Sequence, residues 1–119
     1  MTALRLISLP VHGALEMLVG FLLMAAPFAL GLSPAAGVLG VVVGTLLVGL
    51  ALSSAGPEAE GHQVLSVATH HAFDYGLASG LLGASLVVGA AGDRPGAALF
   101  ALAALMQLAL NLTTRYSRH

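Results

Sequence analysis

The chain contains no cysteine, no lysine and no tryptophan, and only 8% of its 119 residues are charged. The absence of cysteine excludes disulfide bonds and metal sites built on thiolates. The scarcity of charge excludes an ordinary soluble domain, in which about a quarter of the residues are charged. Aromatic residues are also few, at 5%. The composition therefore indicates that the chain lies in an apolar environment.

The charge that is present has no dominant sign. Four arginines stand against five carboxylates, giving a formal net charge of −1 and an isoelectric point near 6.5. Because no basic patch exists to neutralise phosphates, nucleic acid is excluded as a partner. The sequence also lacks a Walker loop, a zinc-protease motif, a nucleophile elbow and a glycine-rich dinucleotide turn. No reaction can be assigned from a motif, and we expect a protein without catalysis of its own.

Hydrophobic residues dominate, at 58% of the chain, with a mean hydropathy of +0.97. They fall into four runs, at 11–32, 35–52, 67–91 and 96–112. A membrane-spanning helix needs roughly 20 apolar residues, within a range of about 17–25. The runs do not alternate in polarity, and they are rich in alanine and leucine, which favour helix. The sequence predicts an all-α fold, a four-helix transmembrane bundle forming a single membrane domain over 1–119.

Turn residues divide this bundle into two tandem two-helix repeats. Ser33-Pro34 is typical of a helix start, with a capping side chain followed by proline in the first turn. The segment after the second run is the most polar of the chain. We therefore predict one repeat over about 10–54, a linker over 55–66 and a second repeat over about 67–113.

The arginines predict the orientation in the membrane. Arg5, Arg115 and Arg118 flank the two ends of the chain, whereas Arg94 occupies a turn between helices. Because an even number of spans puts both ends on one side, the positive-inside rule predicts cytoplasmic termini in a multi-pass protein of the inner (plasma) membrane. A cleaved signal peptide is disfavoured, because Glu16 would interrupt its apolar region.

Two histidine–carboxylate pairs recur at the same place in the two repeats. His12-Gly-Ala-Leu-Glu16 is followed, 58 positions later, by His70-His71-Ala-Phe-Asp74. Residues four apart lie on one face of a helix. A carboxylate at the centre of a membrane helix costs about 2.5–3.5 kcal/mol on insertion scales, so both should face protein or water. We expect the two pairs to meet at one depth, near the cytoplasmic face.

The segment 25–33, Ala-Ala-Pro-Phe-Ala-Leu-Gly-Leu-Ser, resembles the SPW repeat of small bacterial membrane proteins. The segment 40–44, Gly-Val-Val-Val-Gly, is similar to the second helix of that repeat. The Ser-Pro-Trp signature itself is replaced by Ala-Pro-Phe in the first copy and by Ala-Ser-Leu in the second. The likeness covers most of 10–52 and, more weakly, 68–113. It implies an architecture of tandem two-helix repeats and no particular reaction.

Small residues at four-residue spacing indicate where helices approach closely. They are Gly40 and Gly44 in the second run, and Ala72, Gly76, Gly80 and Ala84 in the third. In lipid such stripes allow backbones to pack against one another. The neighbour is either another helix of the bundle or a partner subunit.

The polar residues of the spans lead to three interpretations of function. The residues expected in one layer are His12, Glu16, His70, Asp74, Gln107, Asn111 and Arg115. In the first interpretation they are structural hydrogen bonds within an accessory or assembly component, whose partners are the lipid bilayer and a second copy or another membrane subunit. In the second they hold a cofactor in a membrane redox protein. In the third the carboxylates and histidines carry protons or ions across the membrane.

The cofactor interpretation names particular ligands. Haem b would take its axial ligands from His12, His70 and His71, and a divalent metal would be held by His12, Glu16, His70 and Asp74. Neutral imidazoles facing each other from parallel helices are suited to either group. The sequence alone selects neither.

Overall fold

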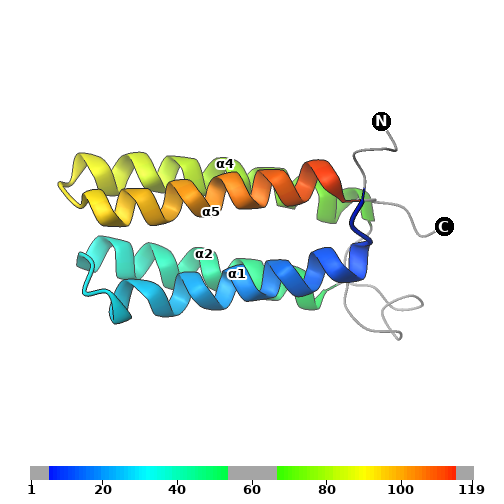
Figure 1. The fold of residues 1–119 in the computed structure, drawn as a ribbon, viewed down its shortest axis with the longest axis horizontal. Helices are drawn as coiled ribbons and strands as arrows, with labels where there is room; N and C mark the ends of the chain where they lie inside the picture. The colour runs from blue at the N-terminus through cyan, green and yellow to red at the C-terminus, as the bar shows by residue number, and fades with distance from the viewer. Residues whose placement is uncertain (1–5, 54–66, 115–119) are drawn as a thin grey trace.

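The computed structural model describes residues 6–53 and 67–114. These residues form four α-helices, drawn in Figure 1: α1 (Leu9–Ala29), α2 (Pro34–Leu52), α4 (Val67–Ala90) and α5 (Arg94–Thr113). Their order confirms the predicted all-α four-helix bundle made of two tandem helix pairs. The predicted linker 55–66 lies outside the described residues.

Each helix is long and apolar enough to cross a membrane. The candidate spans contain 21, 20, 23 and 20 residues, and about 20 helical residues cover the roughly 30 Å of a bilayer's hydrocarbon core. The outward faces carry large apolar side chains, among them Phe21, Leu86 and Leu102, which are 52%, 70% and 65% exposed. Such a surface suits lipid, as expected of a small polytopic membrane protein.

Three of the helices begin in the same way. A side-chain oxygen accepts a hydrogen bond from the backbone N–H three residues later, and a proline occupies the first helical turn. The capping residues are Ser8, Ser33 and Asp93. The start predicted at Ser33-Pro34 is therefore confirmed. The tight turns before α2 and α5 use Gly31 and Gly92, whose φ angles of 65° and 95° favour glycine.

The helices pair as two hairpins that lie side by side. Helix α1 packs along α2 and α4 along α5, while the hairpins meet mainly through α2 with α4 and α1 with α5. Helices α1 and α4 are therefore diagonal neighbours, and they run in the same direction (Figure 1). The starts of α1 and α4 and the ends of α2 and α5 lie together, at what we call the terminal end. There Ile7 N–H donates to the carbonyl of Thr113 at 2.9 Å.

At the opposite end the two hairpin turns are joined by Asp93. Its Oδ2 accepts from the backbone N–H of Ser33 at 2.9 Å, and its Oδ1 accepts from Gly96 N–H at 2.8 Å. Hydrogen bonds from the side chain and backbone of Ser33, with the one from Gly96, lower the pKa of Asp93. One carboxylate thus caps α5 and links the two hairpins.

The two small-residue stripes have different roles. A Cβ on Gly44 would lie 2.5 Å from the carbonyl oxygen of Gly20, and one on Gly40 would collide with the carbonyl of Leu23. These glycines therefore set the close approach of α2 to α1, as the spacing predicts. Gly76 and Gly80 are instead exposed on α4, with no atom of the described chain beyond α4's own backbone within 4 Å of their Cβ positions, and Gly76 borders a groove between α4 and α2. Packing inside the bundle does not explain them.

Candidate metal centre

The two histidine–carboxylate pairs meet in the centre of the bundle near its terminal end. His12 and Glu16 lie on successive turns of α1, and His70 and Asp74 lie on successive turns of α4. We call these four residues the buried cluster. Their exposed fractions are 0% for three and 1% for His70. Because α1 and α4 are diagonal and run the same way, matching positions on them face each other across the core, as the sequence predicts.

The nitrogen and oxygen atoms of the buried cluster are close enough to share one ion. His12 Nε2 lies 3.0 Å from Asp74 Oδ2 and 3.6 Å from Glu16 Oε2. His70 Nε2 lies 3.4 Å from Asp74 Oδ2 and 3.4 Å from Glu16 Oε1. One such atom from each residue can be chosen so that all four lie within 4.8 Å of one another. Asp74 Oδ2 therefore faces both histidines at once.

Helix α5 supplies an amide to the carboxylates. Gln107 Nε2 lies 2.8 Å from Glu16 Oε2 and 3.4 Å from Asp74 Oδ1, and it also reaches Asn111 Oδ1 at 3.3 Å. Gln107 and Asn111 are both fully buried. The glutamine thus donates to one carboxylate of each hairpin and fixes their relative position. The positions of Gln107 and Asn111 confirm two of the three residues that the sequence predicts for this layer from the fourth helix.

Thr114 adds a contact to the other side of His12. Its Oγ1 lies 2.7 Å from His12 Nδ1 and donates to the carbonyl of Leu110 at 2.5 Å. The threonine is fully buried. The sequence reasoning did not include it, although Gln107, Asn111 and Thr114 follow the i, i+4, i+7 spacing of one helix face. That spacing places Thr114 on the same face of the helix as Gln107, but it does not indicate the contact with His12.

Several polar atoms in and beside the buried cluster make no hydrogen bond within residues 6–53 and 67–114. They are Glu16 Oε1 and both ring nitrogens of His70, together with Gln107 Oε1. Buried polar atoms in proteins are nearly always hydrogen-bonded, because leaving one unsatisfied costs about 1–3 kcal/mol. His70 Nε2 and Glu16 Oε1 are near each other without bonding geometry. These two atoms are therefore placed to interact with something other than each other.

Not every predicted site residue joins this group. His71 is half-buried on a different face of α4, where its ring packs edge-on against Tyr75 with centroids 4.9 Å apart. Arg115, expected among the partners of the carboxylates, lies outside the described residues. Within those residues the sole arginine is Arg94, which begins α5 at the end of the bundle opposite the buried cluster.

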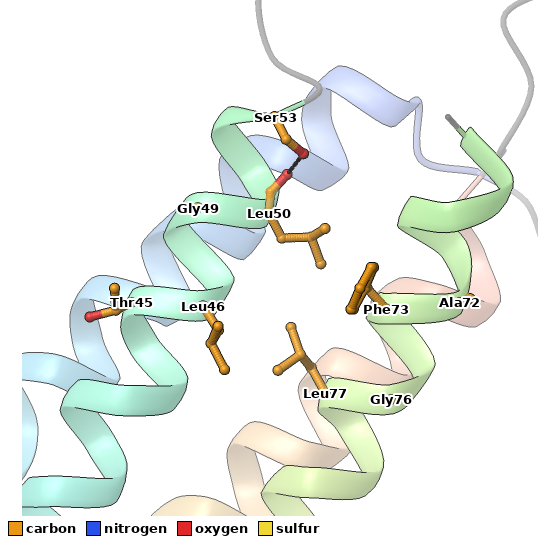
Figure 2. A pocket seen from close by; sticks show the side chains of 9 residues that line it. All are labelled: Thr45, Leu46, Gly49, Leu50, Ser53, Ala72, Phe73, Gly76 and Leu77. Carbon is orange, nitrogen blue, oxygen red and sulfur yellow. Dashed lines mark hydrogen bonds between the residues drawn. The ribbon is translucent and has the colours of Figure 1, made fainter. Parts of the chain in front are cut away.

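A groove opens between α2 and α4, beside the turns that carry His70 and Asp74. Figure 2 shows Leu46 and Leu50 of α2 facing Phe73 and Leu77 of α4 across it. Its volume is about 700 Å³. Small residues on both helices widen it: Gly49 on α2, and Ala72 and Gly76 on α4. The groove is apolar and does not include any residue of the buried cluster.

Comparison with known proteins identified no relative of this chain. The chain matches no protein-family description, no curated protein and no solved structure. Two imidazoles and two carboxylates, removed from water in one group, can bind a cation or hold protons.

Proposed function

We propose that the chain is a small membrane protein that binds one divalent transition-metal ion at His12, Glu16, His70 and Asp74. The observation that carries the proposal is the grouping of four buried donor atoms, from two helices, within 4.8 Å. Imidazole and carboxylate donors suit ions such as Zn²⁺, Mn²⁺ and Fe²⁺. The absence of cysteine argues against the softer ions that favour thiolates.

The distances support this assignment. A tetrahedral ion with bonds of about 2.0–2.2 Å holds neighbouring donor atoms roughly 3.3–3.6 Å apart. The four histidine–carboxylate separations are 3.0, 3.4, 3.4 and 3.6 Å, with a different Glu16 oxygen facing each histidine. When one atom is taken from each residue, all four lie within 4.8 Å of one another, so the widest pair must draw closer around an ion. An ion could therefore be bound after small side-chain movements. Its two positive charges would offset the two carboxylates, which are costly to bury unpaired in an apolar bundle.

Haem b fits the same residues less well. A porphyrin ligated by His12 and His70 would lie across the line between their Nε2 atoms. Glu16 and Asp74 occupy that region, because their oxygens are 3.0–3.6 Å from those nitrogens. His71, the third candidate haem ligand, is turned toward Tyr75. These contacts favour a single ion over a macrocycle.

A route for ions through the bundle also receives little support. The core beyond the buried cluster contains large side chains that are at most 1% exposed: Leu23, Leu47, Leu81, Val88 and Phe100. Ser85 is the buried polar residue among them, and its hydroxyl donates to the carbonyl of Ala97 at 2.7 Å. Such a core favours an ion that stays in place over one that passes through.

An ion at this position would join the two hairpins, because it takes one pair of ligands from each. We therefore retain the role of an accessory or assembly component of the inner membrane, with the metal as a cross-link between α1 and α4. The proposed kinship with the SPW repeat agrees with a helix–turn–helix in each half and with equivalent ligand pairs. A second copy or another membrane subunit stays the proposed partner.

Metal analysis of the purified protein tests the proposal. We expect about one transition-metal ion per chain, lost in His70→Ala and in Asp74→Asn because each removes one of four ligands. His71→Ala is the matched control, since it changes the neighbouring histidine outside the cluster, and it should keep the ion. Added Zn²⁺ at about 100 times its Kd should stabilise the metal-free protein by about 2.7 kcal/mol in thermal unfolding. A metal-free preparation that Zn²⁺, Mn²⁺ and Fe²⁺ leave unstabilised contradicts the proposal.

A further inference from the structure

The hydroxyl of Thr114 can donate only one hydrogen bond, and the distances around Oγ1 indicate its acceptor. Oγ1 lies 2.5 Å from the carbonyl oxygen of Leu110, which can only accept. Oγ1 also lies 2.7 Å from His12 Nδ1. Since the hydroxyl proton is committed to Leu110, the contact with His12 requires that Nδ1 carries the proton and donates it to Thr114.

The tautomer of His12 decides which of its atoms is free to bind an ion. In a neutral imidazole one nitrogen is a donor and the other an acceptor. With the proton on Nδ1, the lone pair is on Nε2, the nitrogen that faces Asp74 at 3.0 Å. In the neutral ring these two electron-rich atoms repel each other at that distance, so the contact requires either a metal ion or a second ring proton on Nε2, which a bound ion would replace.

We infer that Thr114 is a positioning residue of the metal site: it holds the Nδ1 proton of His12 and thereby presents Nε2 as the ligand atom. The inference rests on the proposed function for its consequence, although the tautomer itself is independent of any ion. Histidine ligands commonly donate their second N–H to such a neighbour, and its loss typically weakens metal binding about 10–100-fold.

Removing the hydroxyl should reverse the tautomer. Without Thr114 as an acceptor, the best remaining partner for a ring proton of His12 is the Asp74 carboxylate, 3.0 Å from Nε2. The proton then moves to Nε2 and occupies the ligand position. An ion must displace it before it can bind, which costs affinity even if every ligand side chain stays in place.

His70, the other histidine of the site, has no described partner that would fix the position of its ring proton in this way. His70 Nδ1 makes no hydrogen bond within residues 6–53 and 67–114. In the sequence, the position 58 residues before Thr114 is Gly56, which carries no hydroxyl. The fixed tautomer is therefore a property of His12, and the two histidines of the site are not equivalent.

The first experiment reads the tautomer without metal. Nitrogen-15 NMR of the metal-free full chain, with His12 assigned by comparison with His12→Gln, is recorded while the pH is raised until the ring is neutral. We expect the remaining proton on Nδ1 in the natural protein and in Thr114→Ser, and on Nε2 in Thr114→Val. A natural protein whose neutral His12 carries its proton on Nε2 overturns the inference, whether or not the protein binds metal.

The second experiment measures binding with Co²⁺, whose visible absorption reports ligation. We expect Thr114→Val to weaken Co²⁺ binding about 10–100-fold and Thr114→Ser to restore it. Thr113→Val is the control, because that hydroxyl donates to Ala109 at 2.7 Å and does not contact the cluster. Equal Co²⁺ affinity in the natural protein and Thr114→Val overturns the role of Thr114. Absence of Co²⁺ binding in every variant overturns the proposed function instead, while the tautomer result stands.

Discussion

At the scale of single residues, Gln107 decides how the two carboxylates of the buried cluster are held. Its amide nitrogen donates to Glu16 of one hairpin and reaches Asp74 of the other. Without Gln107, Glu16 Oε2 and Asp74 Oδ1 would lose the donor that α5 supplies to them. The glutamine therefore acts on the ligands without being one.

Replacing this amide with an apolar side chain of similar size tests its contribution. We expect Gln107→Leu to lower the free energy of unfolding by about 1–3 kcal/mol, because buried carboxylate oxygens lose their donor. Denaturation in detergent micelles, followed by circular dichroism, measures the change. Leu105→Ala on the lipid-facing side of α5, 65% exposed, should have a much smaller effect. Similar losses in the two variants would show that Gln107 does not support the carboxylates.

The residues of the buried cluster could be predicted from the sequence for a physical reason. A carboxylate in a membrane helix must face inward, and a histidine four positions before it must share that face. Thr114 was not predictable in the same way, because a threonine near a helix end is ordinary in any environment. Its role depends on the 2.7 Å contact with His12, which follows from how α5 packs on α1. The contact of Asp93 with Ser33 likewise depends on how two turns meet.

At the scale of helices, the boundaries were predictable because turn chemistry marks them. The predicted run 35–52 and the observed α2 (Pro34–Leu52) differ by one residue at the start, where Ser33 caps the helix. The roles of the two glycine stripes were not predictable. All four helices are apolar around most of their circumference, so the sequence carries little information on which face turns inward.

This difference between stripes gives a matched pair of substitutions. Gly44→Ala should weaken the packing of α1 on α2, because its Cβ would lie 2.5 Å from the carbonyl of Gly20. Gly80→Ala introduces the same methyl group where no described atom lies within 4 Å. It should be neutral or stabilising by up to about 1 kcal/mol, since alanine favours helix over glycine. Thermal unfolding of both variants checks the expectation; a destabilising Gly80→Ala would instead indicate a partner on the outer face of α4.

At the scale of the whole molecule, both ends of the described chain lie at one end of the bundle (Figure 1). Three of the four arginines of the sequence flank the two ends, and the positive-inside rule therefore predicts that this end faces the cytoplasm. Reporter fusions at the N- and C-termini should both report a cytoplasmic location. Fusion at the turn around Gly92 is the control and should report the opposite side. A periplasmic signal from either terminus would contradict this orientation.

The position of the buried cluster along the helices has an electrical consequence. His12 and Glu16 lie in the first two turns of α1, which begins at Leu9, about 5–10 Å along a span of roughly 30 Å. An ion entering from the terminal end would cross only about a quarter of the membrane potential. With 2.3 kcal/mol per charge for each 100 mV across the full membrane, a divalent ion would gain or lose ~1 kcal/mol. Depolarising the cell would therefore change the occupancy of the site only severalfold.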